Sequence, residues 1–318
     1  MPKIFMILII LIVIAIAMYF IIKPSKLKHP ELQNTIIKGS MLFDGKNRSY
    51  IYYVPNGLPQ NPSLVIALHR SKSNAQDLRE TMNYRYDELA DKYKFIVLYP
   101  DGYEGNWNDC RKAPKDSAHK LKINDTGFIK SLIDLFKKNY SINSAQVYAT
   151  GFSAGGHMCL KLAVEIPELI SKIAPTLFQI PLPENYTCDK SITPLPILIV
   201  NGTDDPISPY EGGEVSILKI IKQGKVYSVN ETAKHFLKLN NLFNEPIISN
   251  YPSIFDKNEI WIEKKVWKEN KKFPLHQIIV HGGGHTLPGT NKLPSLIFGK
   301  TYNDYIIADD IVDFFLKK

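Results

Sequence analysis

Short runs of apolar and β-branched residues alternate along the chain with segments whose apolar residues recur at helical spacing. Continuous apolar runs predict buried strands at residues 64–68, 95–99, 146–149 and 195–200. Helical spacing and capping residues predict helices near residues 75–93, from Asn124 to Phe136, at 154–164, from Ser228 to Leu237 and at 307–315. Strands that alternate with helices in this way are typical of βαβ units, so we expect an α/β fold around a mostly parallel sheet flanked by helices.

Two further pairs of strands are predicted near the ends of this pattern. Residues 35–43 and 49–54 indicate an opening hairpin, and residues 260–267 and 275–280 indicate a second pair joined by a polar turn. Neither an internal repeat nor a Ser- or Pro-rich linker divides this region of the sequence. We therefore expect one domain over residues 29–318.

The chain begins with an apolar run, residues 4–22, of nineteen residues without a charge. At about 1.5 Å per residue, a helix of this length is close to the hydrocarbon thickness of a bilayer. Ala15–Ala17 is an acceptable cleavage site for a secretory signal, whereas the apolar residues after it favour an uncleaved anchor. We expect residues 1–28 to be an N-terminal hydrophobic helix that acts as a membrane anchor or signal segment. A buried soluble helix is the alternative.

Composition adds little that is specific, but it excludes several classes of protein. With 44% hydrophobic residues and only three cysteines, the chain is neither a low-complexity disordered protein nor a small disulfide framework. The formal net charge is +8, and the first 28 residues hold four lysines and no acidic residue, which leaves +4 for residues 29–318. This small balance gives no reason to expect a nucleic-acid partner.

The sharpest chemical signal is the pentapeptide Gly151–Gly155, which lies between a predicted strand and a predicted helix. A nucleophilic Ser153 has to project from a cramped strand-to-helix turn, and the glycine on either side relieves the crowding. The N–H groups at the start of the following helix face the oxyanion that develops during acyl transfer. In this setting the pattern predicts a catalytic serine, and an ordinary serine in a glycine-rich turn is the alternative.

A serine hydroxyl needs an adjacent base, and the base needs a carboxylate to orient it. In α/β-hydrolases these groups follow in the order serine, acid, histidine, each on a loop after a strand. Asp204 and Asp205 follow one predicted strand, and His281 and His285 follow a later one, so the order is satisfied. His285 is the preferred base because His281 ends its strand and three glycines carry His285 onto the loop.

The oxyanion hole requires two N–H donors. Ala154, directly after the nucleophile, is expected to supply one of them. The loop after residues 64–68 is expected to supply the other, through the N–H of Arg70. His69 in the same loop is predicted to be a structural residue rather than a second base.

Eight stretches in order carry a resemblance to a known family. They read LVIALH, YPDGYEGNWND, INDTGFIKSLID, VYATGFSAGGHM, APTLF, PILIVNGTDDPISPYEGG, SVNETAKHFLKLN and HGGGHTLPG, and they fall within residues 36–317. The body resembles the polyhydroxybutyrate depolymerase and feruloyl esterase group of secreted α/β-hydrolases, which is related to the family-one carbohydrate esterases.

This resemblance implies an α/β-hydrolase fold, an acyl-enzyme mechanism and no metal or organic cofactor. It implies a triad of Ser153, Asp205 and His285, and so favours Asp205 over Asp204. It also implies an extracytoplasmic location, either secreted or anchored by the N-terminal segment. The lysines that follow residues 4–22 point the other way, because the positive-inside rule favours a cytoplasmic body.

Two departures from the family pattern bear on the substrate more than on the chemistry. Arg70 stands where the family usually has glycine, and Leu287 stands where it usually has tryptophan. Trp107 lies in a segment that lines the pocket in related enzymes, where it would stack on an aryl or sugar ring; a packed loop tryptophan is the alternative. His69, Trp107 and Leu287 are the expected pocket residues.

The cysteines leave one question open. Cys110 and Cys188 would form a disulfide in an exported protein or remain two free thiols. Cys159 falls among apolar residues of the helix after the nucleophile and is predicted to be buried and inert.

These observations predict a serine esterase. Its expected substrates are feruloyl or acetyl esters of polysaccharide, or short polyhydroxyalkanoate esters. Its expected partners are such an ester, as an oligosaccharide or polyester, and a membrane through residues 4–22 if that segment is uncleaved. The alternatives are a serine peptidase or acyltransferase with the same triad, and a non-catalytic surface-binding protein of the same fold.

Overall fold

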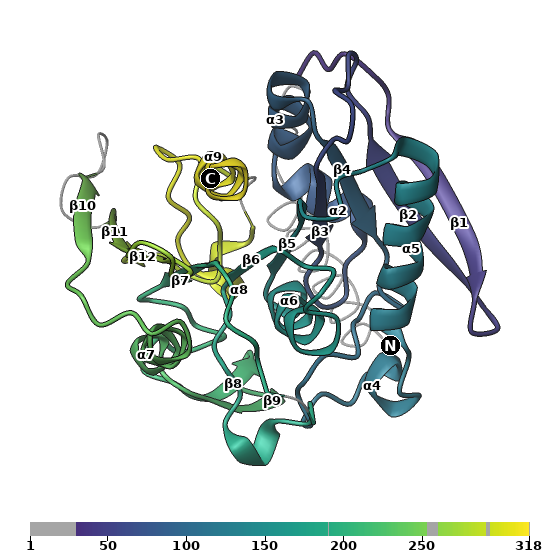
Figure 1. Ribbon diagram of the computed structural model, residues 1–318. Coiled ribbons are helices and arrows are strands. Elements are labelled where there is room, and N and C mark those ends of the chain that lie inside the picture. Colours follow the sequence, from purple (N-terminus) through teal and green to yellow (C-terminus); the bar gives the residue numbers. More distant parts are fainter. Residues whose placement is uncertain (1–29, 190, 253–259, 291–292, 318) are drawn as a thin grey trace, which may run out of the picture.

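The structure, a computed structural model, describes residues 30–189, 191–252, 260–290 and 293–317 (Figure 1). The predicted N-terminal segment lies outside these residues. Within the described ranges, no helix has both the length and the hydrophobicity that crossing a bilayer requires.

A single ten-stranded sheet runs through the described part of the chain, in the order β1-β2-β4-β3-β5-β6-β7-β12-β11-β10. Its strands are β1 (Ile37–Phe43), β2 (Lys46–Tyr53), β3 (Leu64–Leu68), β4 (Ile96–Pro100), β5 (Val147–Phe152), β6 (Lys172–Thr176), β7 (Ile197–Gly202), β10 (Ile247–Pro252), β11 (Trp261–Trp267) and β12 (Leu275–His281). The strands from β4 to β12 in this order are parallel, and antiparallel pairs extend both edges. The predicted α/β fold with a mostly parallel sheet is confirmed.

Helices cover both faces of this sheet (Figure 1). They are α2 (Ala75–Thr81), α3 (Arg85–Tyr93), α4 (Ser117–Lys120), α5 (Asp125–Tyr140), α6 (Ala154–Glu165), the 3₁₀ helix η1 (Pro183–Asn185), α7 (Val229–Leu239), α8 (Ser295–Phe298) and α9 (Ile307–Leu316). A separate two-stranded hairpin, β8 (Gly213–Ile217) and β9 (Ile221–Val226), follows β7.

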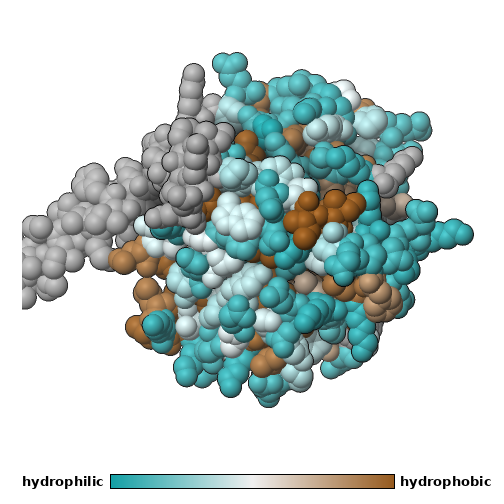
Figure 2. All heavy atoms as spheres, turned by 90° about the vertical axis from the view of Figure 1, so that its left-hand side faces the viewer, coloured by the Kyte–Doolittle hydropathy of each residue, from teal (hydrophilic) through white to brown (hydrophobic). Residues whose placement is uncertain are grey.

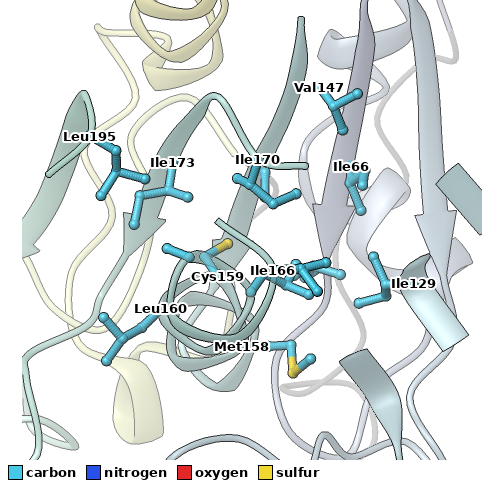
Figure 3. Packing of buried hydrophobic residues seen from close by; sticks show 14 of the residues in the cluster. Ile66, Ile129, Val147, Met158, Cys159, Leu160, Ile166, Ile170, Ile173 and Leu195 are labelled. Atoms are coloured by element: carbon cyan, nitrogen blue, oxygen red, sulfur yellow. The ribbon is translucent and has the colours of Figure 1, made fainter. Parts of the chain in front are cut away.

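Two apolar cores form because successive side chains of a buried strand point to opposite faces of the sheet. In β3, Leu64 and Ile66 join the core under α5 and α6, whereas Val65 and Ala67 join the core under α2, α3 and α9. Figure 3 shows the first core, in which side chains of α6 lie against strand residues. Residues buried on both faces explain why the central strands are apolar throughout their length.

The predicted helix over residues 75–93 is instead two helices, α2 and α3. Asn83 and Tyr84 between them adopt left-handed backbone conformations, with φ of 52° and 59°. A right-handed helix cannot continue through such residues, so the chain turns and starts again. Helical spacing on both sides of the break conceals it in the sequence.

Strand β10 forms one edge of the sheet and is exposed along its whole length. Figure 2 faces the side of the molecule that carries this edge and shows separate hydrophobic groups among predominantly hydrophilic ones. At the opposite edge, β1 pairs with β2 as the expected opening hairpin.

Candidate active site

Ser153 lies at the sharp turn between β5 and α6, where the sequence places the pentapeptide. Its φ of 56° is in the left-handed region, which non-glycine residues adopt rarely and at a cost in backbone strain. The Ser153 N–H donates to the carbonyl oxygen of Thr176 at the end of β6, over 2.9 Å. The turn is thus held from the neighbouring strand, and the residue is only partly buried.

The glycines of the pentapeptide allow the turn to be this tight. A Cβ at Gly151 would overlap the carbonyl group of Gly155, and a Cβ at Gly155 would overlap the carbonyl of Leu68 at the end of β3. The start of α6 therefore packs directly against the backbone of two strands. Side chains at either position would push the helix away from the sheet and move Ser153.

Asp205 and His285 come together from loops that are 80 residues apart in sequence. His285 Nδ1 and Asp205 Oδ2 are 2.6 Å apart, and both side chains are almost completely buried. The other oxygen, Asp205 Oδ1, accepts the N–H groups of Ile207 and Ser208, each at 2.8 Å. The carboxylate is thereby fixed by its own loop, and its remaining oxygen orients the imidazole.

His285 also lies beside the nucleophile turn. Its ring centroid is 5.8 Å from that of Phe152, the residue before Ser153. The backbone N–H of His285 donates to the carbonyl of Phe298 over 2.6 Å, which fixes the loop that carries His285 against α8. A hydrogen bond from Ser153 to His285 is not among the contacts of the described residues; in ligand-free enzymes such contacts are often long and tighten only around the substrate.

The two alternative residues have other surroundings. Asp204 is exposed and accepts a hydrogen bond from the Thr203 hydroxyl. His281 stacks on Trp261 with ring centroids 3.8 Å apart, and its Nε2 is 3.2 Å from Glu263. Of the candidate acids and bases, the structure therefore pairs Asp205 with His285.

Of the predicted oxyanion donors, Arg70 lies in the loop after β3, and Ala154 is the first residue of α6. Hydrogen bonds from their N–H groups are absent from those recorded for the described residues. The Arg70 guanidinium lies over the Phe298 ring, 5.5 Å from its centroid. The side chain that replaces the usual glycine thus packs against α8.

His69 and Trp107 form one packed unit beneath the loop that carries Arg70. His69 Nε2 accepts the Gly102 N–H over 2.8 Å, so Nδ1 carries the proton and donates to the Arg70 carbonyl over 2.7 Å. Burial lowers the pKa of His69 to about 4. Trp107 donates to the His69 carbonyl over 2.9 Å and is only 1% exposed. Both rings hold the loop in place, and the Trp107 ring is enclosed in this structure.

Leu287, the third expected pocket residue, is also buried. It contributes to a small cavity directly beneath the nucleophile turn. The other residues that line this cavity are Leu78, Met82, Tyr86, Thr150, Gly151, Phe152 and Thr176.

Sequence reasoning missed two residues that support the site. Thr176 accepts the Ser153 N–H through its carbonyl, and its hydroxyl donates to the Gly151 carbonyl over 2.8 Å. Gln179 donates to the Pro209 carbonyl over 2.6 Å and accepts the Ser208 hydroxyl, and so holds the Asp205 loop. The available signal in the sequence was the amide side chain of Gln179, which stands between apolar residues. A buried polar side chain of this kind needs hydrogen-bond partners.

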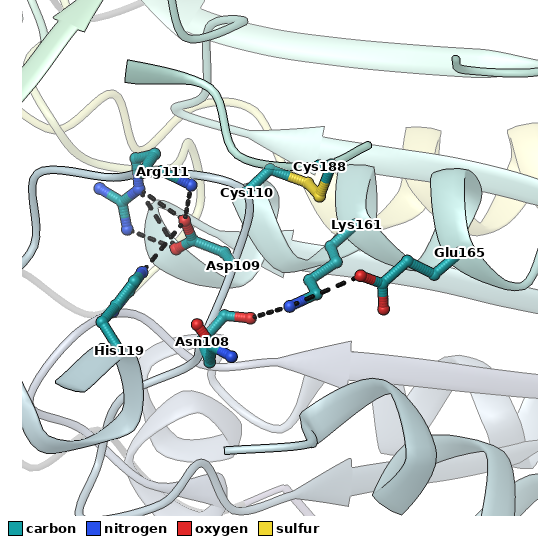
Figure 4. Close-up of a disulfide and its surroundings, with 8 residues drawn as sticks. All are labelled: Asn108, Asp109, Cys110, Arg111, His119, Lys161, Glu165 and Cys188. Atoms are coloured by element: carbon teal, nitrogen blue, oxygen red, sulfur yellow. Dashed lines mark hydrogen bonds and ion pairs between the residues drawn. A yellow bond between two sulfur atoms is a disulfide. The ribbon is translucent and has the colours of Figure 1, made fainter. Parts of the chain in front are cut away.

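The loop after Trp107 is fixed by a disulfide between Cys110 and Cys188 (Figure 4). Beside it Asp109 and Arg111 form a buried ion pair, with 2.6 Å between Arg111 Nη2 and Asp109 Oδ2. Burial opposes protonation of the nearby His119, but Asp109 and Asp116 outweigh it and raise the pKa of His119 to about 9. Cys159 is free and buried, as predicted.

The described residues contain no cluster of three or more His, Cys, Asp or Glu side chains placed to hold a metal ion.

Comparison with known proteins agrees with the resemblance seen in the sequence. Residues 48–177 match the family model described as Esterase PHB depolymerase. A protein of Nocardia uniformis subsp. tsuyamanensis that bears the name esterase NocK is 25% identical over 298 residues, which cover 91% of this chain and 85% of the relative. Poly(3-hydroxyalkanoate) depolymerase C of Paucimonas lemoignei is 27% identical over 266 residues, 76% of this chain and 59% of the relative.

A solved structure shares the fold. The acetyl xylan esterase from Aspergillus awamori superimposes with a TM-score of 0.56 at 20% identity, over 89% of this chain and 99% of that one. The predicted α/β-hydrolase fold is confirmed, and so is the expected kinship with esterases and depolymerases. The match to the Esterase PHB depolymerase model is thus confined to residues 48–177, and the chain is a hydrolase of the esterase type.

Proposed function

We propose that the chain is a serine carboxylesterase with Ser153 as nucleophile, His285 as base and Asp205 as orienting acid. The observation that carries this proposal is the buried Asp205–His285 hydrogen bond of 2.6 Å, which lies beside the strained turn of Ser153. A buried carboxylate on Nδ1 leaves Nε2 as the nitrogen that exchanges a proton with the serine.

The reaction proceeds through an acyl-enzyme. Ser153 Oγ attacks the ester carbonyl carbon while His285 Nε2 takes the hydroxyl proton. The tetrahedral oxyanion accepts hydrogen bonds from the N–H groups of Ala154 and Arg70. Collapse expels the alcohol, which receives its proton from His285. Water then attacks the acyl-enzyme with His285 again as base and releases the acid and Ser153.

The proposed substrates are feruloyl or acetyl esters of polysaccharide, or short polyhydroxyalkanoate esters. Support comes from the family match and from relatives named as an esterase and a poly(3-hydroxyalkanoate) depolymerase. We place the enzyme outside the cytoplasm, secreted or held by residues 4–22. The Cys110–Cys188 disulfide supports this location because disulfides persist in oxidising compartments.

The test is release of p-nitrophenol from p-nitrophenyl acetate by the full chain and by its Ser153→Ala variant. The proposal predicts that the variant loses on the order of 10⁴-fold or more in kcat/KM, because the covalent route disappears. Equal rates from two folded proteins would exclude Ser153 as the nucleophile. Methyl ferulate, acetylated xylo-oligosaccharide and hydroxybutyrate oligomers then distinguish the substrate classes.

A further inference from the structure

The β8–β9 hairpin presents apolar side chains to solvent at its tip. Leu218, Ile220 and Ile221 are 59%, 78% and 44% exposed, and they lie within four consecutive residues, 218–221, which we call the hairpin tip. Clustered exposed aliphatic residues usually mark a surface that contacts something apolar.

The backbone conformation of the hairpin tip is unusual for the residues that it contains. Leu218 and Lys219 have φ of 52° and 58°, in the left-handed region that glycine and asparagine adopt most readily. A leucine there is unfavourable for the turn itself and gains nothing from burial.

The base of the hairpin, in contrast, is firmly packed. Val215 and Val226 are buried against Ile207. The Asn185 side-chain amide donates to the carbonyls of Gln223 and Lys225, at 3.3 and 3.2 Å. The hairpin is thus anchored at its base, and Figure 1 shows β8 and β9 apart from the main sheet.

Basic residues accompany the apolar tip. Lys219 lies within it, and Lys222 and Lys225 follow along β9; all three are exposed. In the part of the chain that the structure describes, none of them forms an ion pair with a carboxylate. Aliphatic side chains beside unpaired lysines are typical of segments that lie at the boundary between lipid headgroups and acyl chains.

We propose that the hairpin tip docks onto a lipid surface that carries anionic headgroups. Leu218, Ile220 and Ile221 enter the interface, and the lysines contact the negatively charged headgroups. A second copy of the chain fits less well, because three aliphatic residues bury too little area for a stable dimer and two identical tips would repel through their lysines. This docking does not depend on the proposed esterase activity.

The hairpin also has a connection to the active site. Phe298 packs against the apolar base of the hairpin, and its carbonyl accepts the His285 N–H over 2.6 Å. The hairpin and the His285 loop are thus joined through Phe298.

The test attaches an environment-sensitive nitrobenzoxadiazole dye to Ile220→Cys in the full chain, because the native Cys159 is buried and the other two cysteines are paired. Leu42→Cys is the matched control: Leu42 is 79% exposed against 78% for Ile220, and it lies on β1, an edge strand of the main sheet. Both proteins carry residues 4–22, so any attachment through that segment is common to both. Vesicles contain phosphatidylcholine alone or with phosphatidylglycerol.

The proposal predicts at least a twofold rise in emission at position 220 with phosphatidylglycerol vesicles, and little change at position 42. Exchange of Lys219, Lys222 and Lys225 for serine, or 0.5 M salt, should abolish most of that rise. An equal response at both positions, or an equal response to neutral vesicles, would overturn the proposal. A response to polyester particles but to neither vesicle would replace lipid with a polymer surface. Unchanged hydrolysis of p-nitrophenyl acetate by the lysine variant would show that its fold is intact.

Discussion

At the scale of single residues, neighbouring side chains of the same type have different surroundings. Asp205 is buried and contacts His285 at 2.6 Å, whereas the adjacent Asp204 is exposed. The sequence alone left the two aspartates open, because only the folded loop shows which carboxylate faces the imidazole. The resemblance to a known family favoured Asp205.

This contrast gives a matched pair of variants. Asp205→Asn should lower kcat by about 10³- to 10⁴-fold, because an amide stabilises the wrong tautomer of His285 and not the imidazolium. Asp204→Asn should retain kcat within about twofold. Steady-state kinetics on p-nitrophenyl acetate measure both. A large loss in Asp204→Asn with none in Asp205→Asn would reverse the assignment.

His69 predicts a pH dependence of stability. Burial lowers the pKa of its folded form to about 4, below the ordinary 6.5, so the unfolded chain takes up a proton first as the pH falls. The contribution of neutral His69 to the free energy of unfolding is fully present above pH 6.5. It is lost as the pH falls to 4, which lowers the free energy of unfolding by about 3 kcal/mol. Its Nε2 could no longer accept the Gly102 N–H once protonated.

Urea unfolding at pH 7, 5.5 and 4.5 measures this loss. The buried His157 and the partly buried His276 contribute with the same sign, because burial also lowers their pKa. In the His69→Gln variant, the free energy of unfolding should therefore still fall as the pH falls, but less steeply. The difference in slope should correspond to the uptake of about one proton. An unchanged slope in that variant would contradict the role of His69.

At the scale of elements, the nucleophile turn depends on contacts between backbones. Gly155→Ala should destabilise the fold by at least about 2 kcal/mol, because its Cβ would overlap the Leu68 carbonyl and rigid backbone cannot yield cheaply. Gly156→Ala is the matched control, since its nearest contacts are 3.0 Å away, and it should lose less. Urea unfolding measures the free energy of unfolding of both variants. Equal losses would show that the close approach of residue 155 to the Leu68 carbonyl does not determine stability.

The sequence predicted those elements whose pattern of apolar and capping residues agrees with their burial in the fold. The apolar run at residues 64–68 is β3 as observed, and the capping box at Ser228 does begin α7. β6 was not predicted because Pro175 is unusual within a strand, and β10 was not predicted because its side chains are all exposed and show no buried face. Both owe their existence to neighbouring strands, which a local pattern does not reveal.

At the scale of the whole molecule, the Cys110–Cys188 disulfide encloses the segment that contains the nucleophile turn. The paired cysteines are 78 residues apart. For a loop of that size, cross-linking stabilises the fold by about 4 kcal/mol in the chain-entropy account. Reduction with dithiothreitol should therefore lower the Tm.

Thiol titration gives an independent check of the pairing. The native protein should show no rapidly reacting thiol, the unfolded protein one, from Cys159, and the unfolded and reduced protein three. Three reactive thiols before reduction would show that Cys110 and Cys188 are free.

The central claim is that Ser153 is an activated nucleophile, and labelling with a fluorophosphonate followed by mass spectrometry of the peptides tests it most directly. The account predicts one adduct, on Ser153, that forms at least about 100-fold more slowly in His285→Ala and at nearly the native rate in His281→Asn. Labelling of another residue, or no labelling of the folded protein, would contradict it.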